Sequence, residues 1–413
     1  ILTFGIGFLP TFGQVTEMGM KVLGVFIGVI YGWIFLGLTW PSFFSMIALS
    51  LVGYTNISAA FGTGMAYYLV PILFVTFIFA AAVGKTGITE WLAEWLMSRK
   101  IIIGRPYVLI IVLFLGMELL AVLNTSFVGL MMIWTMAVSL AEKAGMPKHN
   151  PFVAFMIPAL TVIFVLAGFI MPFHAGSVMY LGFFTQGMGV TFPEAQYIIW
   201  HLIIINLYIL VLAAAAKFIF RLDLKGIEVA LESYKDKTCP KMNGNQKFGL
   251  ALLLIFMLTL LAPSFLPAEW AAMKAIKSMG VLGVATILTI VLLMKRNDDG
   301  SEFVTIAEIS RGISWDVIWL IVATTPLANA LNDAACGIMT VMGFLTPILT
   351  GMSPFIFIAA CAIILGLVTQ VTHNLILAIV FIPILVPLCQ QLGGNPYTCY
   401  LAIYFALTMA FMT

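Results

Sequence analysis

Long apolar runs with almost no charge in them dominate this sequence. Residues 22–38, 67–83, 153–170 and 197–216 are such runs, and they approach or reach the roughly 20 residues that a helix needs to cross the hydrocarbon core of a bilayer. Charged residues make up 9% of the chain, against about a quarter in soluble domains. The sequence therefore predicts an all-α polytopic membrane protein, and it excludes a soluble enzyme with a charged surface.

Two short polar stretches interrupt these apolar runs. Asn124, Thr125 and Ser126 follow a run (106–123) whose only charge is Glu118, and residues 369–374 follow a run without any charge. A polar break inside a membrane leaves backbone groups without helical partners, which is tolerated only where protein lines a cavity. The two breaks are therefore the candidate binding site. Alternatively, Asn and Thr in such positions merely hydrogen-bond neighbouring helices.

The spacing around the two breaks favours a site. Gly87 precedes Asn124 by 37 residues, and Gly337 precedes Asn374 by the same number. We interpret this as two inverted repeats, each with a re-entrant hairpin and an unwound transmembrane helix, because matched interruptions in two halves mark transporter binding sites. The predicted parts are a first repeat at 1–220 (hairpin 106–144, unwound helix 151–188), a linker at 221–247, and a second repeat at 248–413 (hairpin 353–392).

The predicted linker also orients the chain. Seven basic residues lie in 217–247 against four acidic ones, which predicts the cytoplasmic side. The net charge of +2 is too small to indicate a nucleic-acid partner. The chain opens without Met and closes inside an apolar run, so we expect a part of something longer, with a C-terminally incomplete second repeat.

These motifs resemble those of the divalent-anion/sodium symporter family, the citrate, dicarboxylate and sulfate transporters of the ion-transporter superfamily. That family carries Ser-Asn-Thr at each hairpin tip; Leu123-Asn124-Thr125 and the stretch from Thr369 to Leu375 are similar to it. Met171-Pro172 with Gly176-Ser177 is similar to its unwound helix. The resemblance implies a homodimer in which a transport domain moves against a scaffold, an elevator mechanism.

The resemblance also implies binding residues, to which we add the two histidines inside the predicted membrane segments. The predicted substrate-binding residues are Asn124, Thr125, Ser126, His174, Gly176, Ser177, His373 and Asn374. Sodium, the expected coupling ion, would bind near Asn124 and Gly176 and, at a second position, near Thr369, Thr372 and Asn374. No organic cofactor is expected.

The sequence departs from the family pattern where cations would bind. Leu119 and Leu123 stand where the family has hydroxyl side chains, and His373 and Leu375 replace Ser and Thr in the second motif. We therefore expect fewer coupled sodium ions than in the family. His373 is interpreted in two ways: as a neutral imidazole bonded to a hairpin carbonyl, or as a protonatable group that replaces a cation or pairs with a substrate carboxylate.

Other conspicuous residues have simpler interpretations. Glu118 is predicted to pair across helices rather than to carry protons, and Asp333 to cap a helix end. The five cysteines are predicted to be buried free thiols. No zinc cluster, nucleophile–base pair or phosphate loop is recognisable, which argues against an enzyme.

The sequence thus predicts a cation-coupled secondary transporter for a di- or tricarboxylate in a bacterial inner (plasma) membrane. Two alternatives stay open. One is a sodium-independent anion exchanger or proton-coupled carrier. The other is a sulfate or Na⁺/H⁺ transporter of the same superfamily.

Overall fold

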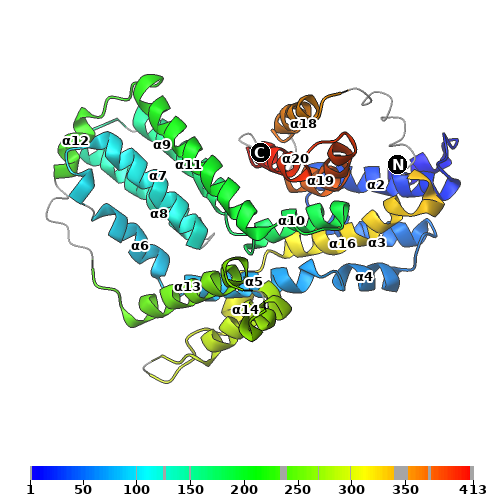
Figure 1. Cartoon of the computed structure of the whole chain (residues 1–413), viewed down its shortest axis with the longest axis horizontal. Helices are drawn as coiled ribbons and strands as arrows, with labels where there is room; N and C mark the ends of the chain where they lie inside the picture. The colour runs from blue at the N-terminus through cyan, green and yellow to red at the C-terminus, as the bar shows by residue number, and fades with distance from the viewer. Residues whose placement is uncertain are drawn as a thin grey trace. The chain divides into compact units, whose positions relative to one another are not determined.

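The computed structural model describes residues 2–98, 100–123, 127–147, 150–232, 240–267, 269–297, 299–338, 352–370 and 374–409. In these ranges the regular structure is helical, apart from an isolated bridge between Arg296 and Glu302. The helices, labelled in Figure 1, are α1 (Leu2–Gly5), η1 (Ile6–Phe8), α2 (Glu17–Phe35), α3 (Thr39–Leu51), α4 (Ile57–Met65), α5 (Leu69–Gly84), α6 (Ile88–Met97), η2 (Lys100–Ile102), α7 (Pro106–Leu123), α8 (Phe127–Lys143), α9 (Pro151–Ala167), α10 (Ala175–Met188), α11 (Glu194–Phe218), α12 (Lys225–Glu232), α13 (Gly244–Phe265), α14 (Ala271–Met294), α15 (Ile306–Ser310), α16 (Trp315–Asn332), η3 (Ala334–Cys336), α18 (Pro354–Val368), α19 (Asn374–Gln391) and α20 (Pro396–Thr408).

Six helices in the described ranges are long and apolar enough to cross a membrane: α2, α7, α11, α13, α14 and α19. A seventh span results if α4 and α5, bent by 54° at a short break, are taken together. Three shorter apolar helices, α3, α9 and α18, accompany them. The prediction of a polytopic helical membrane protein is confirmed by the length and composition of these helices.

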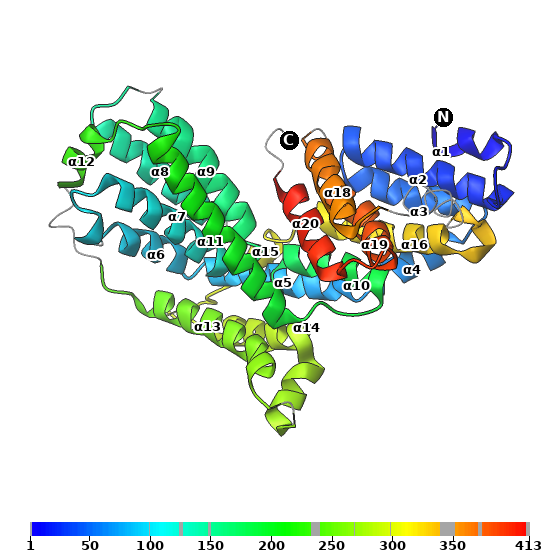
Figure 2. The same ribbon diagram turned by 45° about the horizontal axis from the view of Figure 1, so that its top comes forward.

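The chain divides into two compact units. The first unit contains Ile1–Phe74, Val178–Phe192 and Ile313–Thr413, and the second contains Val75–Ser177 and Pro193–Gly312. In the first unit α16 packs against α2, α3 and α4, while α20 packs against both α18 and α19 (Figure 2). Gly64 on α4 allows one of these contacts, because an added Cβ would lie 2.0 Å from the carbonyl oxygen of Val322 on α16.

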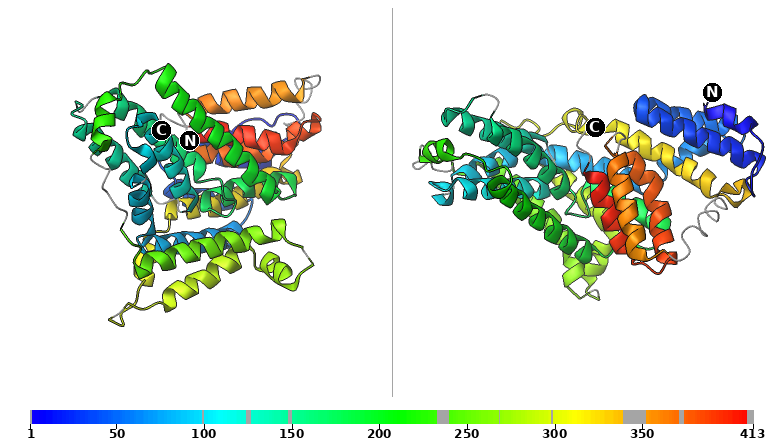
Figure 3. Two further views of the ribbon diagram at one scale, coloured as in Figure 1. Left: turned by 60° about the vertical axis from the view of Figure 1, so that its left-hand side comes forward. Right: turned by 90° about the horizontal axis from the view of Figure 1, so that it is seen from above.

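In the second unit α7 and α8 lie side by side, with α9 and α11 packed against α7 (Figure 1). The amphipathic helix α6 buries Ile88, Leu92 and Leu96, and Leu96 reaches a site on α7 that only Gly116 leaves open. Helices α13 and α14 pair with each other, as the yellow-green helices in the left view of Figure 3 show. The two arms predicted for the first hairpin are thus present as helices α7 and α8.

Local sequence explains several helix starts. Trp40-Pro41 lies in the first turn of α3, where a proline is tolerated because that N–H has no helical partner. The predicted linker contains α12 and the start of α13, which Asn243 and Gln246 cap reciprocally. Thr305 and Glu308 cap the short α15 in the same way.

Candidate functional site

The predicted unwound helix is interrupted between α9 and α10. Helix α9 ends at Ala167 and α10 begins at Ala175. The break therefore starts earlier than predicted from Met171-Pro172, and Gly176 and Ser177 lie in the first turn of α10. Pro172 cannot donate a backbone hydrogen bond, so a continuous helix here would lose a bond.

Side chains satisfy the carbonyl groups that the break leaves without helical partners. The Nδ1 atom of His174 lies 2.9 Å from the carbonyl oxygen of Gly168. The hydroxyl groups of Ser177 and Tyr197 both donate to the carbonyl oxygen of Phe169, at 3.1 and 2.8 Å. Two predicted substrate ligands thus hold the backbone of the break in this conformation. Tyr197 was not predicted; its only signal is a phenol at the start of an apolar run.

Gly176 has a packing role in the break. A Cβ at this position would lie 2.7 Å from Cε1 of Phe169, closer than any real side chain allows. Only glycine therefore lets the Phe169 ring lie against the first turn of α10. This packing fixes the backbone of Phe169, whose carbonyl receives Ser177 and Tyr197.

His174 also faces a small cavity in the second unit. The cavity has a volume of about 60 Å³, room for about two water molecules. Its lining includes Thr76 on α5, Leu123 at the end of α7 and Phe256 on α13. Leu123 immediately precedes the first polar motif. The helix break and the end of α7 therefore meet at one cavity.

Side-chain hydrogen bonds join the second hairpin to the end of α20 within the first unit. Thr369 is fully buried, and its hydroxyl donates to the carbonyl oxygen of Leu407 at 3.2 Å. The amide of Gln370 donates to Gly366 at 2.9 Å and to Met409 at 2.8 Å. The end of α18 thus binds carbonyl groups at the end of α20, which have no helical partner of their own. Gln370 was not predicted, although it lies inside the motif.

The predicted site residues fall into three groups: those in the second unit, those in the first unit, and those outside the described residues. His174, Gly176 and Ser177 lie together in the second unit, and Thr369 and Asn374 lie in the first. Asn374 opens α19, and its side-chain oxygen accepts from the N–H of Leu375 at 2.9 Å. Asn124, Thr125, Ser126, Thr372 and His373 lie outside the described residues.

The second hairpin carries neutral oxygen atoms, the type of ligand that a hard monovalent cation prefers. The Thr369 hydroxyl, the Leu407 carbonyl and the Asn374 amide are neutral oxygen donors, of the type that sodium prefers over soft ligands. The first hairpin differs, because Leu123 lines the cavity beside His174 and Leu119 is also apolar. Neither leucine can ligate a cation, whereas the second hairpin keeps oxygen atoms that can.

Three sequence predictions about other polar residues are confirmed. Glu118 on α7 is buried and accepts a hydrogen bond from Asn206 on α11 at 3.0 Å, so it pairs across helices. Asp333 caps η3 and also accepts from the hydroxyl of Tyr54 at 3.1 Å. Cys336, Cys361, Cys389 and Cys399 are buried free thiols, while Cys239 lies outside the described residues.

Comparison with known proteins supports the resemblance that the motifs indicate. No family model matches the chain. Over 195 residues the chain is 20% identical to the sodium-dependent dicarboxylate transporter SdcS of Staphylococcus saprophyticus. The match covers 47% of this chain and 37% of that protein. The similarity therefore spans well under half the length of the relative.

Proposed function

We propose that this chain belongs to a secondary active transporter that carries a small organic anion, a di- or tricarboxylate, across a bacterial inner membrane. The similarity to a sodium-dependent dicarboxylate transporter supports the substrate class. The observation that carries the proposal is the cavity where Leu123, at the end of a hairpin arm, meets His174, in a broken span. Such interruptions at membrane depth are tolerated where they line a cavity.

The anion would bind at the polar motifs and at the helix starts beside them. Amide and hydroxyl groups of Asn124, Thr125, Ser126 and Asn374 are the proposed ligands. The first turns of α10 and α19 add backbone N–H groups and the positive ends of the helix dipoles. His373 and His174 would contact the carboxylate or its hydroxyl substituents.

Ser177 can join this site without breaking the backbone fold. Its hydroxyl proton is directed to the Phe169 carbonyl, to which Tyr197 also donates. When Ser177 rotates toward a substrate, Tyr197 still satisfies that carbonyl, so the cost of a bare buried acceptor is avoided. Tyr197 is therefore proposed as a positioning residue.

Sodium coupling, where it occurs, would use the oxygen donors of the second hairpin, with Thr369, Thr372 and Asn374 as proposed ligands. Gly176 and Asn124 would form a weaker first position, because Leu119 and Leu123 supply no oxygen. Proton coupling or anion exchange is the second candidate function. It is favoured because Leu119 and Leu123 stand where oxygen ligands would be needed, and because the titratable His174 lines the same cavity as Leu123.

Repeated local features support the proposal of two repeats, whereas the proposed homodimer and elevator mechanism follow from the family resemblance alone. Gly87 and Gly337 both adopt positive φ, of 73° and 68°. After each hairpin an asparagine caps a helix whose first residue is proline, Asn150 before α9 and Asn395 before α20. Equivalent turns at equivalent places are what two copies of one unit would retain.

A ligand screen tests the substrate class. Purified protein would be heated with succinate, malate, citrate, tartrate or sulfate, because a ligand that binds only the folded state raises the unfolding temperature with concentration. We expect at least one carboxylate to stabilise the protein saturably, and Asn374→Ala to abolish that effect. Stabilisation by sulfate alone would contradict the carboxylate assignment.

A further inference from the structure

The first unit contains a cavity that the proposed anion site does not use. Its volume is about 330 Å³, and α2, α10, α16 and α19 contribute its walls. This volume falls in the range of small-molecule pockets. None of the predicted substrate or sodium ligands lines it.

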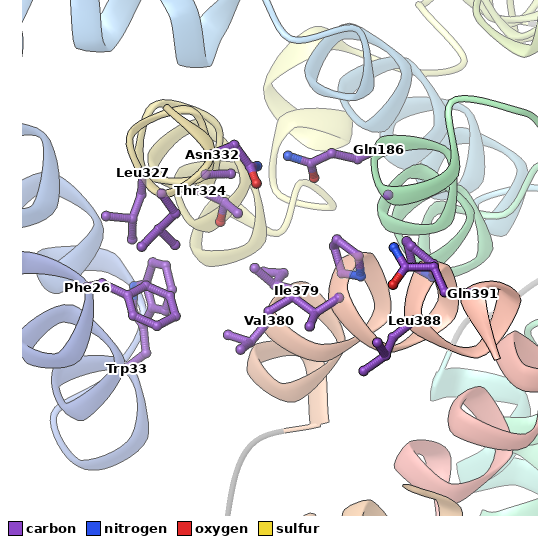
Figure 4. Close-up of a pocket in the computed structure, with 16 residues that line it drawn as sticks. Phe26, Trp33, Gln186, Thr324, Leu327, Asn332, Ile379, Val380, Leu388 and Gln391 are labelled. Carbon is purple, nitrogen blue, oxygen red and sulfur yellow. The ribbon is translucent and has the colours of Figure 1, made fainter. Parts of the chain in front are cut away.

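One end of the cavity is apolar. Phe26 and Trp33 on α2 lie on one side, and Ile379 and Val380 on α19 lie on the other (Figure 4). Leu327 on α16 closes this end, and it is buried together with Trp33 and Ile379. A ligand group placed here would leave water entirely, which favours a hydrocarbon chain.

The other end carries three carboxamides. Asn332 on α16 and Gln186 on α10 point toward one another, and Gln391 ends α19 nearby (Figure 4). All three side chains are exposed, so they form a polar rim to the buried apolar end. The described residues that line the cavity include no charged side chain.

Two prolines lie in the wall formed by α19. Pro383 and Pro387 both line the cavity. Since proline has no N–H, the carbonyls of Ile379 and Pro383 lose their usual helical partners. Gly187 lets α10 approach here and cover the Pro383 carbonyl, because an added Cβ would lie 2.8 Å from that oxygen.

The cavity extends along α19. Its lining on that helix runs from Ile379 to Gln391, which corresponds to about 18 Å along a helix. An extended acyl chain can lie along a wall of that length.

We propose that this cavity binds an uncharged, single-chain amphiphile with a hydroxyl-bearing head, of the monoacylglycerol type. The head lies among the carboxamides, and the acyl chain lies between α2 and α19. The described lining side chains offer no counter-charge that would hold a phosphate or carboxylate head. This site does not depend on the transport activity proposed above.

Photo-crosslinking in lipid nanodiscs tests the proposal. The probe is a 1-monoacylglycerol with a diazirine near the end of its acyl chain, and labelled peptides are mapped by mass spectrometry. We expect label on α16 and α19, reduced about tenfold by Ala328→Trp, which fills the cavity. Leu210→Trp, on the exposed face of α11, is the matched control and should not change the label. Equal labelling of both variants would overturn the proposal.

The head group is tested with matched probes and rim variants. A fatty acid and a lysophosphatidate carrying the same diazirine should label α16 and α19 about tenfold less than the monoacylglycerol. Asn332→Leu with Gln391→Leu alters only exposed side chains, so this variant should fold even if Ala328→Trp does not. It should lower labelling by the monoacylglycerol but not by a headless alkyl diazirine. Charged probes that label as strongly, or unchanged monoacylglycerol labelling in the rim variant, would contradict the assignment.

Discussion

The Nδ1 atom of His174 lies 2.9 Å from the carbonyl oxygen of Gly168. A carbonyl only accepts hydrogen bonds, so this nitrogen carries the proton and the neutral ring has Nε2 as an acceptor. Since the same ring lines the cavity with Leu123, His174 connects the backbone of the helix break to the end of the first hairpin arm.

The first prediction separates the two roles of His174. His174→Asn can still donate to the Gly168 carbonyl, whereas His174→Phe cannot. We expect the unfolding temperature to fall only in the Phe variant, and affinity for a hydroxylated carboxylate such as malate to fall about tenfold in both, because both lose Nε2 as an acceptor for the substrate hydroxyl. Thermal unfolding and ligand titration measure the two effects. Wild-type affinity in the Asn variant would remove His174 from the binding site.

The second prediction concerns the shared carbonyl of Phe169. Ser177→Ala and Tyr197→Phe each remove one of the two hydroxyl donors to that carbonyl, and the double variant removes both. Each single change should cost about 1 kcal/mol of unfolding free energy, and the double change should exceed their sum by about another 1 kcal/mol. Chemical unfolding of the four proteins measures this coupling. Strict additivity would show that the two hydroxyls do not share the acceptor.

The third prediction tests the contact between Gly176 and Phe169. Gly176→Ala places a Cβ against the ring and should cost about 1–3 kcal/mol of stability through overpacking. Phe169→Leu in the same chain removes the clashing atoms and should restore part of the loss. If the second substitution adds to the damage, the clash is not the cause.

The fourth prediction concerns Lys85 and Glu308, on the outer surface of the second unit. The hydrogen bond from Lys85 at 2.7 Å, with bonds from Thr305, lowers the pKa of Glu308 to about 2. Because the pKa falls on folding, this stabilisation is present above the ordinary value near 4.5 and is lost as the pH falls toward about 2. The difference in unfolding temperature between wild type and Glu308→Gln should therefore shrink across that window. A difference independent of pH would contradict the assignment.

The fifth prediction concerns coupling. Leu119 and Leu123 supply no cation ligand, so sodium activation of uptake should have a Hill coefficient of about 1 and leave residual uptake in choline. Uptake should also respond to pH between about 5.5 and about 7.5. Steep, multi-ion sodium dependence without any effect of pH would show that the leucines were misinterpreted.

Local sequence signals predicted much of the fold. Pro172 indicated the helix break, and the apolar run at 106–123 coincides with α7. The apolar run at 22–38 extends past Phe35, where α2 ends. Pro41 did not mark that end, because it lies in the first turn of α3, where a proline is accepted.

The site was less predictable, because hydrogen-bond partners depend on tertiary contacts. His174 lies in the break and Ser177 in the first turn after it, but their bonds to Gly168 and Phe169 depend on the path of the backbone between α9 and α10. Tyr197 reaches the same carbonyl from another helix. Gln370 binds the end of α20, which lies 39 residues further along the chain. No periodicity or motif encodes such pairings.

Counterflow tests the central claim most directly. Proteoliposomes loaded with unlabelled succinate would be diluted into a trace of labelled succinate, and the internal label followed with time. A carrier predicts transient, saturable accumulation of label above equilibrium, abolished by Asn124→Ala and by Asn374→Ala but not by Leu210→Trp. Linear flux without an overshoot, or an unchanged overshoot in both asparagine variants, would contradict the account.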